Sequence, residues 1–284
     1  MKLPTALRLG RVSNLPTVSS DVLAGLALAG WGATSLSTIV RLCAALSLLY
    51  VGGMFLNDAC DATVDARERP ERPIPAGQAT RAEVLGWSAA LLLAGIGLAF
   101  STGWRSGLAA LLTAGTIVLY DLLHKRTRAA PALMGLCRMG VYWTAALSVS
   151  SLEVARVFVG GLVLFAYVLG LTYAAARENT TALVRWGPLV GLWAPALLAA
   201  PHALEAPIRI GVLTLFVGWT ARGTRLVRSR DPPAIRRGIA GLIAGIALLD
   251  ALWLAYHGPS LLPALAAVAA FALTLVFQRY VPGT

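Results

Sequence analysis

Apolar runs of roughly 20 residues recur along almost the whole chain, separated by short clusters of charged residues. A helix of that length rises about 1.5 Å per residue and crosses the roughly 30 Å hydrocarbon core of a bilayer. Of the 284 residues, 57% are apolar and only 13% are charged. A soluble domain carries about twice that charged fraction, and a transmembrane β-strand would show alternation instead of continuous runs. The sequence therefore predicts an all-α polytopic membrane protein.

The apolar runs define ten candidate spans. They lie near 17–34, 38–58, 82–101, 104–122, 131–150, 156–176, 183–201, 207–225, 236–256 and 260–279. His257-Gly258-Pro259 ends either a ninth helix or the first arm of a hairpin, so residues 260–279 are the extra, tenth helix of the count. We predict a single transmembrane domain over residues 1–284.

The 24 Lys and Arg residues are distributed unevenly between the two ends of these spans. All but five lie in the N-terminal segment, in the loops after spans two, four, six and eight, or at Arg279. The exceptions are Arg41, Arg105, Arg138, Arg156 and Arg209. By the positive-inside rule both termini face the cytoplasm, which indicates a multi-pass protein of the inner (plasma) membrane. Because the basic residues flank apolar runs, the net charge of +11 does not indicate a nucleic-acid partner.

Acidic residues concentrate at the end of the second span, where five of the 13 in the chain fall between positions 58 and 71. Asn57, Asp61 and Asp65 are spaced i, i+4, i+8 and share one face of a helix. Oxygen ligands stacked at a membrane boundary are typical of a hard-cation site, in which Mg²⁺ keeps positions for water and phosphate oxygens. The competing interpretation is a solvated helix end whose acids pair with Arg67, Arg69 and Arg72.

This motif and the segment after it resemble the first signature of the UbiA superfamily of intramembrane prenyltransferases. The matching residues are Asn57-Asp58-x-x-Asp61-x-x-x-Asp65 and Arg72-Pro73-Ile74-Pro75-Ala76-Gly77. The resemblance implies a UbiA-like bundle of about nine to ten helices around a central cavity that opens to lipid. It also implies that Mg²⁺ on Asn57, Asp61 and Asp65 holds an isoprenyl diphosphate, with Arg72 adding positive charge.

A second element of the resemblance ends the fourth span, at Tyr120-Asp121-Leu122-Leu123-His124-Lys125. The family has a Tyr-x-x-x-Lys-like segment here, which implies that Tyr120 and a basic residue bind the substrate. One extra residue separates Tyr120 from Lys125, so either Lys125 or His124 takes the role of the basic residue. A cation there would stabilise the departing diphosphate.

The third element departs from the family pattern. Where the family has Asp-x-x-x-Asp, this chain has Tyr173-Ala174-Ala175-Ala176-Arg177-Glu178-Asn179, with a single acid. Either Glu178 helps to ligate a second metal, or Arg177 contacts the diphosphate in its place; Tyr173 is a further substrate-binding candidate. With Ser13-Asn14-Leu15-Pro16-Thr17, this pattern is similar to the EboC-like branch of UbiA-related proteins.

Polar residues inside the spans are expensive in lipid and mark functional positions. We expect Arg138, in the fifth span, to line the cavity; the alternative is a salt bridge to Asp250 in the ninth. Asn14 matches a polar family position on the acceptor side, and Asp21 pairs with a neighbouring cation.

The favoured function is Mg²⁺-dependent transfer of an isoprenyl group from an isoprenyl diphosphate to a small acceptor, with release of diphosphate. The allylic cation would form where water is excluded, and Asp58 or Asp121 would take the acceptor's proton. The alternatives are a UbiA-type terpene cyclase and a non-enzymatic lipid carrier or transport protein on the same fold.

Overall fold

The computed structural model describes residues 1–150, 152–176 and 186–283, and in these ranges the chain is helical with no β-strand. The elements are α1 (Leu3–Leu9), η1 (Val12–Asn14), α2 (Leu15–Leu28), α3 (Leu36–Glu68), α4 (Arg81–Phe100), α5 (Trp104–Leu123), α6 (Ala130–Ala146), α7 (Val154–Ala175), α8 (Trp186–Leu189), η2 (Val190–Trp193), α9 (Ala194–Ala199), η3 (Ala200–Glu205), α10 (Pro207–Val227), α11 (Pro232–His257) and α12 (Leu261–Phe277). The predicted all-α class is confirmed.

A helical segment occupies each of the ten expected spans, but in the described part of the chain only six are long and apolar enough to cross a bilayer. These six are α3, α4, α5, α7, the segment Trp186–Glu205 and α11. The others fall short for different reasons. The 14 residues of α2 and the 17 each of α6 and α12 reach only about 21–26 Å at 1.5 Å per residue. Helix α10 carries three arginines, at positions 209, 222 and 225.

Helix α3 positions the acidic motif. Its 33 residues correspond to about 50 Å, well beyond the hydrocarbon thickness of roughly 30 Å. The Ser35 hydroxyl caps the first turn by accepting a hydrogen bond from the Thr38 amide. The helix ends at Glu68, two residues before Pro70, because the residue preceding a proline avoids helical backbone angles. The last three turns of α3 therefore carry the motif to the end of the bundle.

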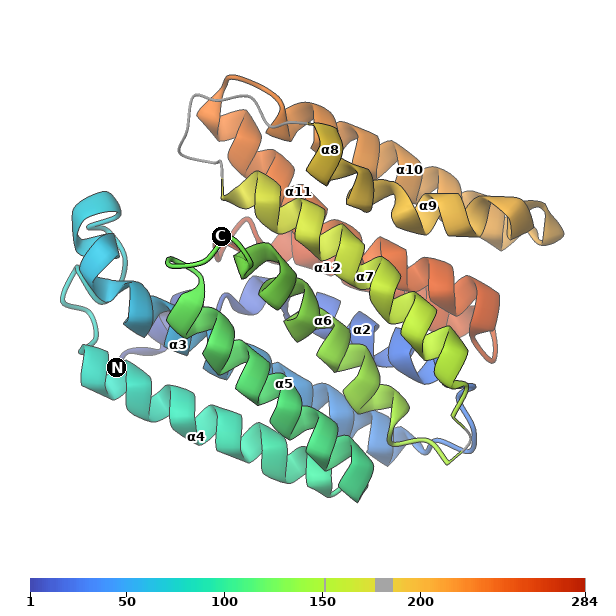
Figure 1. Ribbon diagram of the computed structural model, residues 1–284, viewed down its shortest axis with the longest axis horizontal. Coiled ribbons are helices and arrows are strands. Elements are labelled where there is room, and N and C mark those ends of the chain that lie inside the picture. The colour runs from blue at the N-terminus through green and yellow to red at the C-terminus, as the bar shows by residue number, and fades with distance from the viewer. Residues whose placement is uncertain (151, 177–185, 284) are drawn as a thin grey trace.

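The bundle is organised around α2, which packs against α3, α6, α11 and α12. Helices α3, α4 and α5 lie on one side of the molecule, and α7, α10, α11 and α12 lie on the other (Figure 1). Both chain ends lie at the end of the bundle that also carries the connection from α3 to α4 (Figure 1).

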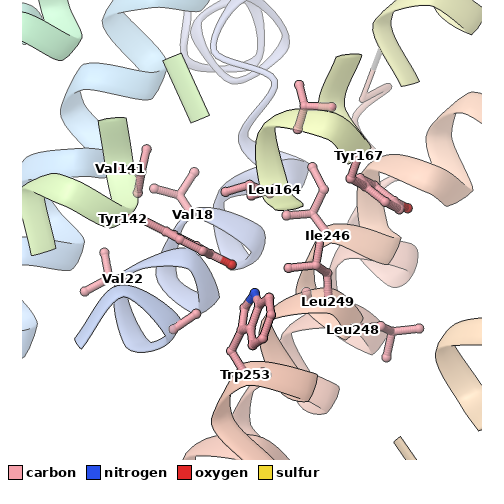
Figure 2. Packing of buried hydrophobic residues seen from close by; sticks show 14 of the residues in the cluster. Val18, Val22, Val141, Tyr142, Leu164, Tyr167, Ile246, Leu248, Leu249 and Trp253 are labelled. Carbon is pink, nitrogen blue, oxygen red and sulfur yellow. The ribbon is translucent and has the colours of Figure 1, made fainter. Parts of the chain in front are cut away.

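The interior is packed by side chains from α2, α6, α7 and α11. Figure 2 shows Val18 and Val22 beside the Tyr142 ring, with Ile246 and Trp253 of α11 across from them. Close approach of α2 and α6 depends on Gly25, where an added Cβ would lie 2.7 Å from the Tyr142 carbonyl oxygen. Helices in lipid associate largely through such small-residue contacts, because burial from water drives them little.

Candidate active site

A cavity of about 460 Å³, which we call the main cavity, opens where α3, α5, α6, α7 and α11 end together. Asn57 and Asp61 of α3 line it, so two oxygen-bearing residues of the predicted motif face the same space. Asp58, one position from Asn57, does not line this cavity and lines a second cavity instead. Asp65 lines neither cavity in the described part of the chain, although it lies on the same face of α3 as Asp61.

Two arginines neutralise the acidic motif from outside the helix. Arg11 Nη2 lies 3.4 Å from Asn57 Oδ1 and 3.2 Å from Asp58 Oδ1. Arg72 Nη1 donates to Asp58 Oδ1 at 3.2 Å and to Asp65 Oδ2 at 3.0 Å. Both arginines also line the main cavity. Asp58 and Asp65 are thus held by guanidinium groups that also face the main cavity, where an anion could meet them.

The end of α5 reaches the same carboxylates. His124 Nε2 lies 3.1 Å from Asp61 Oδ1, and Lys125 Nζ lies 3.4 Å from Asp61 Oδ2. The two candidate cations therefore both reach Asp61, but the His124 side chain is 11% exposed and that of Lys125 is 49% exposed. Tyr120 stacks on the His124 ring, with centroids 5.0 Å apart. Burial lowers the pKa of His124, but the hydrogen bond and negative charge of Asp61 outweigh it and raise that pKa above its ordinary value.

Asp121 links the two helices from the inside. Its Oδ1 accepts a hydrogen bond from Asn57 Nδ2 at 3.0 Å, and its side chain is buried. It lines a smaller apolar cavity of about 70 Å³ that shares five lining residues with the main cavity: Tyr50, Met54, Tyr120, Met134 and Arg138. The rest of that lining is chiefly apolar and comes from α2, α3, α5 and α6: Val18, Leu46, Leu49, Gly53, Thr113, Ile117, Cys137 and Val141. A charged space therefore adjoins a largely apolar one.

Arg138 lies in the wall of both cavities. Its guanidinium pairs with the buried Asp21 carboxylate and donates to Thr17 Oγ1 at 3.0 Å. The alternative of a salt bridge to Asp250 is wrong. That carboxylate instead accepts hydrogen bonds from Ser20 and Tyr142, each at 2.5 Å, because both hydroxyls lie nearer to it in the core.

The remaining sequence candidates are placed differently. Asn14 lines the main cavity and donates to the Tyr50 hydroxyl at 3.1 Å and to the Gly283 carbonyl at 3.0 Å. Tyr173 packs against the hydrophobic core, and it is its neighbour Thr172 that lines the cavity. Arg177 and Glu178 lie outside the described residues.

Sequence reasoning missed two contributors, Arg11 and Tyr50. In the sequence, Arg11 is one more basic residue of the N-terminal segment. In the structure it lies directly before η1 with a left-handed backbone (φ 42°), and its side chain reaches Asp58 of α3. Tyr50 lies 5.7 Å below the Arg138 guanidinium and lines both cavities. An aromatic residue in an apolar run gives no signal of this role.

The oxygen donors of the main cavity suit a divalent cation bound together with other ligands. In the described part of the chain no three His, Cys, Asp or Glu side chains converge as a metal cage. Asn57 and Asp61 nevertheless present hard oxygen donors to a cavity with room for further ligands. This suits Mg²⁺, which retains waters and phosphate oxygens and is bound by one or two carboxylates. The residues present fit the ion.

These features define a polytopic helical membrane protein with a charged cavity at one end of its bundle and an apolar cavity beside it. The chain belongs to the UbiA prenyltransferase family, whose family model matches residues 20–282.

Among similar proteins is a digeranylgeranylglyceryl phosphate synthase of Methanothrix thermoacetophila, 34% identical over 116 residues. That match covers 41% of this chain and 43% of the relative, so the chain spans less than half of that relative's length. A UbiA homologue from Aeropyrum pernix K1 shares the fold, with a TM-score of 0.68 at 14% identity over 87% of this chain and 97% of the other. An Archaeoglobus fulgidus UbiA homologue bound to GPP and Mg²⁺ has a TM-score of 0.62 at 16% identity, over 94% and 99% of the two chains. The EboC-like branch stays a prediction.

Proposed function

We propose that this chain is an intramembrane prenyltransferase that moves an isoprenyl group from an isoprenyl diphosphate to a small acceptor and releases diphosphate. The observation that carries the proposal is the contact between the two cavities. The charged one holds Arg11, Arg72, His124 and Lys125, and the apolar one shares Tyr50, Met54 and Tyr120 with it. A donor with an anionic head and an apolar tail fits this pair of spaces.

The diphosphate would bind in the charged cavity. Asn57 and Asp61 would hold the Mg²⁺, with Asp65 one turn further along α3 and Glu178 as further candidate ligands, and the ion would neutralise the diphosphate and make it a better leaving group. The similar Archaeoglobus fulgidus protein, bound to GPP and Mg²⁺, supports this choice of ion. Arg11, Arg72 and His124 supply fixed positive charge where negative charge develops as the donor C–O bond breaks.

The apolar cavity would protect the allylic cation from water. Leu46, Leu49 and Ile117 offer it no nucleophile, and the Tyr120 ring lies at the junction with the charged cavity. The electron pair of the C–O bond leaves with diphosphate. A carbon or oxygen of the acceptor then bonds to the cation and loses a proton.

Asp121 is the better of the two candidate bases for that proton. It lies in the lining of the apolar cavity, where the cation would form, and it accepts a hydrogen bond from the neutral Asn57 amide. Asp58 is held by both Arg11 and Arg72 at 3.2 Å, and it does not line the apolar cavity. Both guanidinium groups already pair with the Asp58 carboxylate, so it is less available to an acceptor than the Asp121 carboxylate.

The orientation follows from the distribution of basic residues. The end of the bundle with the cavities carries Arg8, Arg72, Lys125 and Arg236. Arg156, one of the few basic residues outside this pattern, lies at the other end. The positive-inside rule supports a cytoplasmic active site in the inner (plasma) membrane.

The deciding experiment incubates the purified protein in nanodiscs with Mg²⁺, isoprenyl diphosphates of increasing length and a membrane lipid extract. Mass spectrometry of products and release of diphosphate are both measured. Transfer to an extract component supports the proposal. A cyclised hydrocarbon made without extract would identify a terpene cyclase. If neither product forms, the interpretation that remains is a non-enzymatic lipid carrier.

Asp61→Asn should lower Mg²⁺-dependent turnover at least 100-fold, because it removes a charged oxygen donor facing the cavity. Glu153→Gln is the matched control, since Glu153 is exposed and pairs only with Arg156 in the described structure. Near wild-type turnover of Asp61→Asn at saturating Mg²⁺ would refute the site.

A further inference from the structure

An open groove of about 580 Å³ lies between α5 and α6, which pack side by side (Figure 1). The two helices meet closely at Gly140, where an added Cβ would overlap the Thr113 hydroxyl. Large apolar side chains along the groove are exposed, namely Leu108, Leu112 and Leu136. None of its lining residues lines the main cavity. We refer to it as the α5–α6 groove.

The α5–α6 groove has the length of one leaflet of a bilayer. Along α5 its lining runs from Trp104 to Thr116, which is 12 positions further on, or about 18 Å at 1.5 Å per residue. Half of the roughly 30 Å hydrocarbon core is about 15 Å. Trp104 is 65% exposed, and such an aromatic side chain is typical of the boundary between membrane and water. The groove therefore begins at headgroup depth and has room for one acyl chain as far as the middle of the bilayer.

The groove has one charged lining residue, Arg105. This arginine is exposed, lies next to Trp104 at the start of α5, and has its guanidinium 5.5 Å from the centroid of the Trp104 ring. The main cavity lies at the other end of α5, where His124 follows the helix. Arg105 therefore places a positive charge at the headgroup end of an apolar groove, in the leaflet away from the main cavity.

Arg105 differs from the other three arginines at that end of the bundle. Arg41 donates to the Ser101 carbonyl oxygen at 2.7 Å, Arg156 lies 2.9 Å from a Glu153 oxygen, and Arg209 pairs with Glu205. Within residues 1–150, 152–176 and 186–283, Arg105 makes neither a hydrogen bond nor an ion pair, and its one contact of this kind is with the Trp104 ring. Its guanidinium donors are available to an anion from the membrane.

We propose that the α5–α6 groove binds one anionic phospholipid of the leaflet opposite the main cavity. Its acyl chain lies along Leu108, Leu112 and Leu136, and its phosphate meets Arg105. A guanidinium group presents paired N–H donors that match phosphate oxygens. A headgroup with net negative charge is favoured over a zwitterionic one, because the zwitterionic headgroup already carries a cation beside its phosphate. This site is separate from the proposed prenyl transfer and does not depend on it.

Lipid binding is measured by native mass spectrometry of the purified protein in detergent. The protein is titrated with phosphatidylglycerol or with phosphatidylcholine of the same acyl chains, and the bound lipids are counted. We expect one site that binds phosphatidylglycerol about fivefold more tightly than phosphatidylcholine. The preference should fall as the salt concentration rises, since an exposed charge pair is screened.

Substitutions of Arg105 test the headgroup contact. Arg105→Gln should make the affinities for the two lipids equal, and Arg105→Lys, which keeps the charge, should retain most of the preference. Arg156→Gln is the matched control, because Arg156 lies at the same end of the bundle, does not line the groove and pairs with Glu153. It should leave the preference unchanged.

Two tryptophan variants of α5 test the place of the acyl chain. Leu108 lines the groove and is 44% exposed, whereas Leu111 is 49% exposed on the same helix and does not line it. Leu108→Trp narrows the groove and should weaken binding of both lipids at least threefold, and Leu111→Trp should change neither affinity. Thermal unfolding in detergent checks that both variants keep the fold.

Either half of the proposal can fail by itself. Equal affinity of the wild type for the two lipids, or a preference that survives in Arg105→Gln, would overturn Arg105 as the headgroup contact. Equal effects of Leu108→Trp and Leu111→Trp would overturn the α5–α6 groove as the place of the chain. Prenyl transfer is tested by product formation in the main cavity, so none of these outcomes bears on it.

Discussion

His124 Nε2 lies 3.1 Å from Asp61 Oδ1, and this contact joins the end of α5 to the acidic turn of α3. Lys125 reaches the other oxygen of the same carboxylate at 3.4 Å. A carboxylate at the end of a membrane helix is costly unless it is compensated, so these cations stabilise Asp61 before any substrate binds. When a diphosphate arrives, the same two groups are within reach of it.

His124→Gln should impair the enzyme more than Lys125→Gln. The His124 side chain is the more buried and is fixed by stacking on Tyr120, whereas Lys125 is a half-exposed, flexible cation. We expect about a tenfold rise in donor KM for His124→Gln and about twofold for Lys125→Gln. Steady-state kinetics with a fixed isoprenyl diphosphate measures both, and the reverse ranking would assign the diphosphate contact to Lys125.

The ion pair between Arg138 and Asp21 gives a test of stability. Asp21 is fully buried, and its Oδ1 accepts no hydrogen bond in the described structure, so the carboxylate depends on the guanidinium of Arg138. Asp21→Asn leaves that cation under-compensated and should destabilise the fold by about 3 kcal/mol. Thermal unfolding in detergent measures it. Glu205→Gln, which breaks the exposed pair with Arg209, should leave the unfolding temperature unchanged.

Close packing of α2 on α6 is tested at Gly25. A methyl group there would lie 2.7 Å from the Tyr142 carbonyl oxygen, which is backbone and can give way only if a helix shifts. Gly25→Ala should therefore cost about 1–3 kcal/mol of stability. At Gly97 an added Cβ meets nothing within 4 Å, so Gly97→Ala should be neutral or slightly stabilising. Equal unfolding temperatures for the two variants would contradict the close contact.

The parts of the molecule that follow local rules could be predicted from the sequence. Helical spacing alone places Asn57, Asp61 and Asp65 on one face of α3, and Pro70 sets where that helix ends. The segment Trp186–Glu205 is divided into short α-helical and 3-10 pieces, and this division has local causes too. Pro195 and Pro201 lie in the first turns of two of these pieces and lack the backbone N–H that a continuous helix needs. The apolar pattern nevertheless predicted one continuous span there.

Contacts between distant segments could not be predicted in this way. Arg138 had two plausible acidic partners, and only the packing of α6 against α2 decides for Asp21 over Asp250. The cavity that Asp58 lines likewise brings together Arg8 and Arg236, which lie far apart in the sequence, and each looks like an ordinary residue of a basic membrane flank. Side-chain spacing carries information within a helix, but partner choice depends on the tertiary arrangement.

The identity of the proton acceptor is tested by comparing Asp121→Asn with Asp58→Asn. If Asp121 is the base, its replacement should lower kcat about 100-fold with little change in donor KM, because the lost step follows ionisation of the donor. Asp58→Asn releases Arg11 and Arg72 from their shared partner and should change KM more than kcat. Asn57 still finds an amide oxygen in Asp121→Asn, so its hydrogen bond with residue 121 is retained. Single-turnover kinetics separates bond breaking from product formation. A fall in kcat confined to Asp58→Asn would identify Asp58 as the base instead.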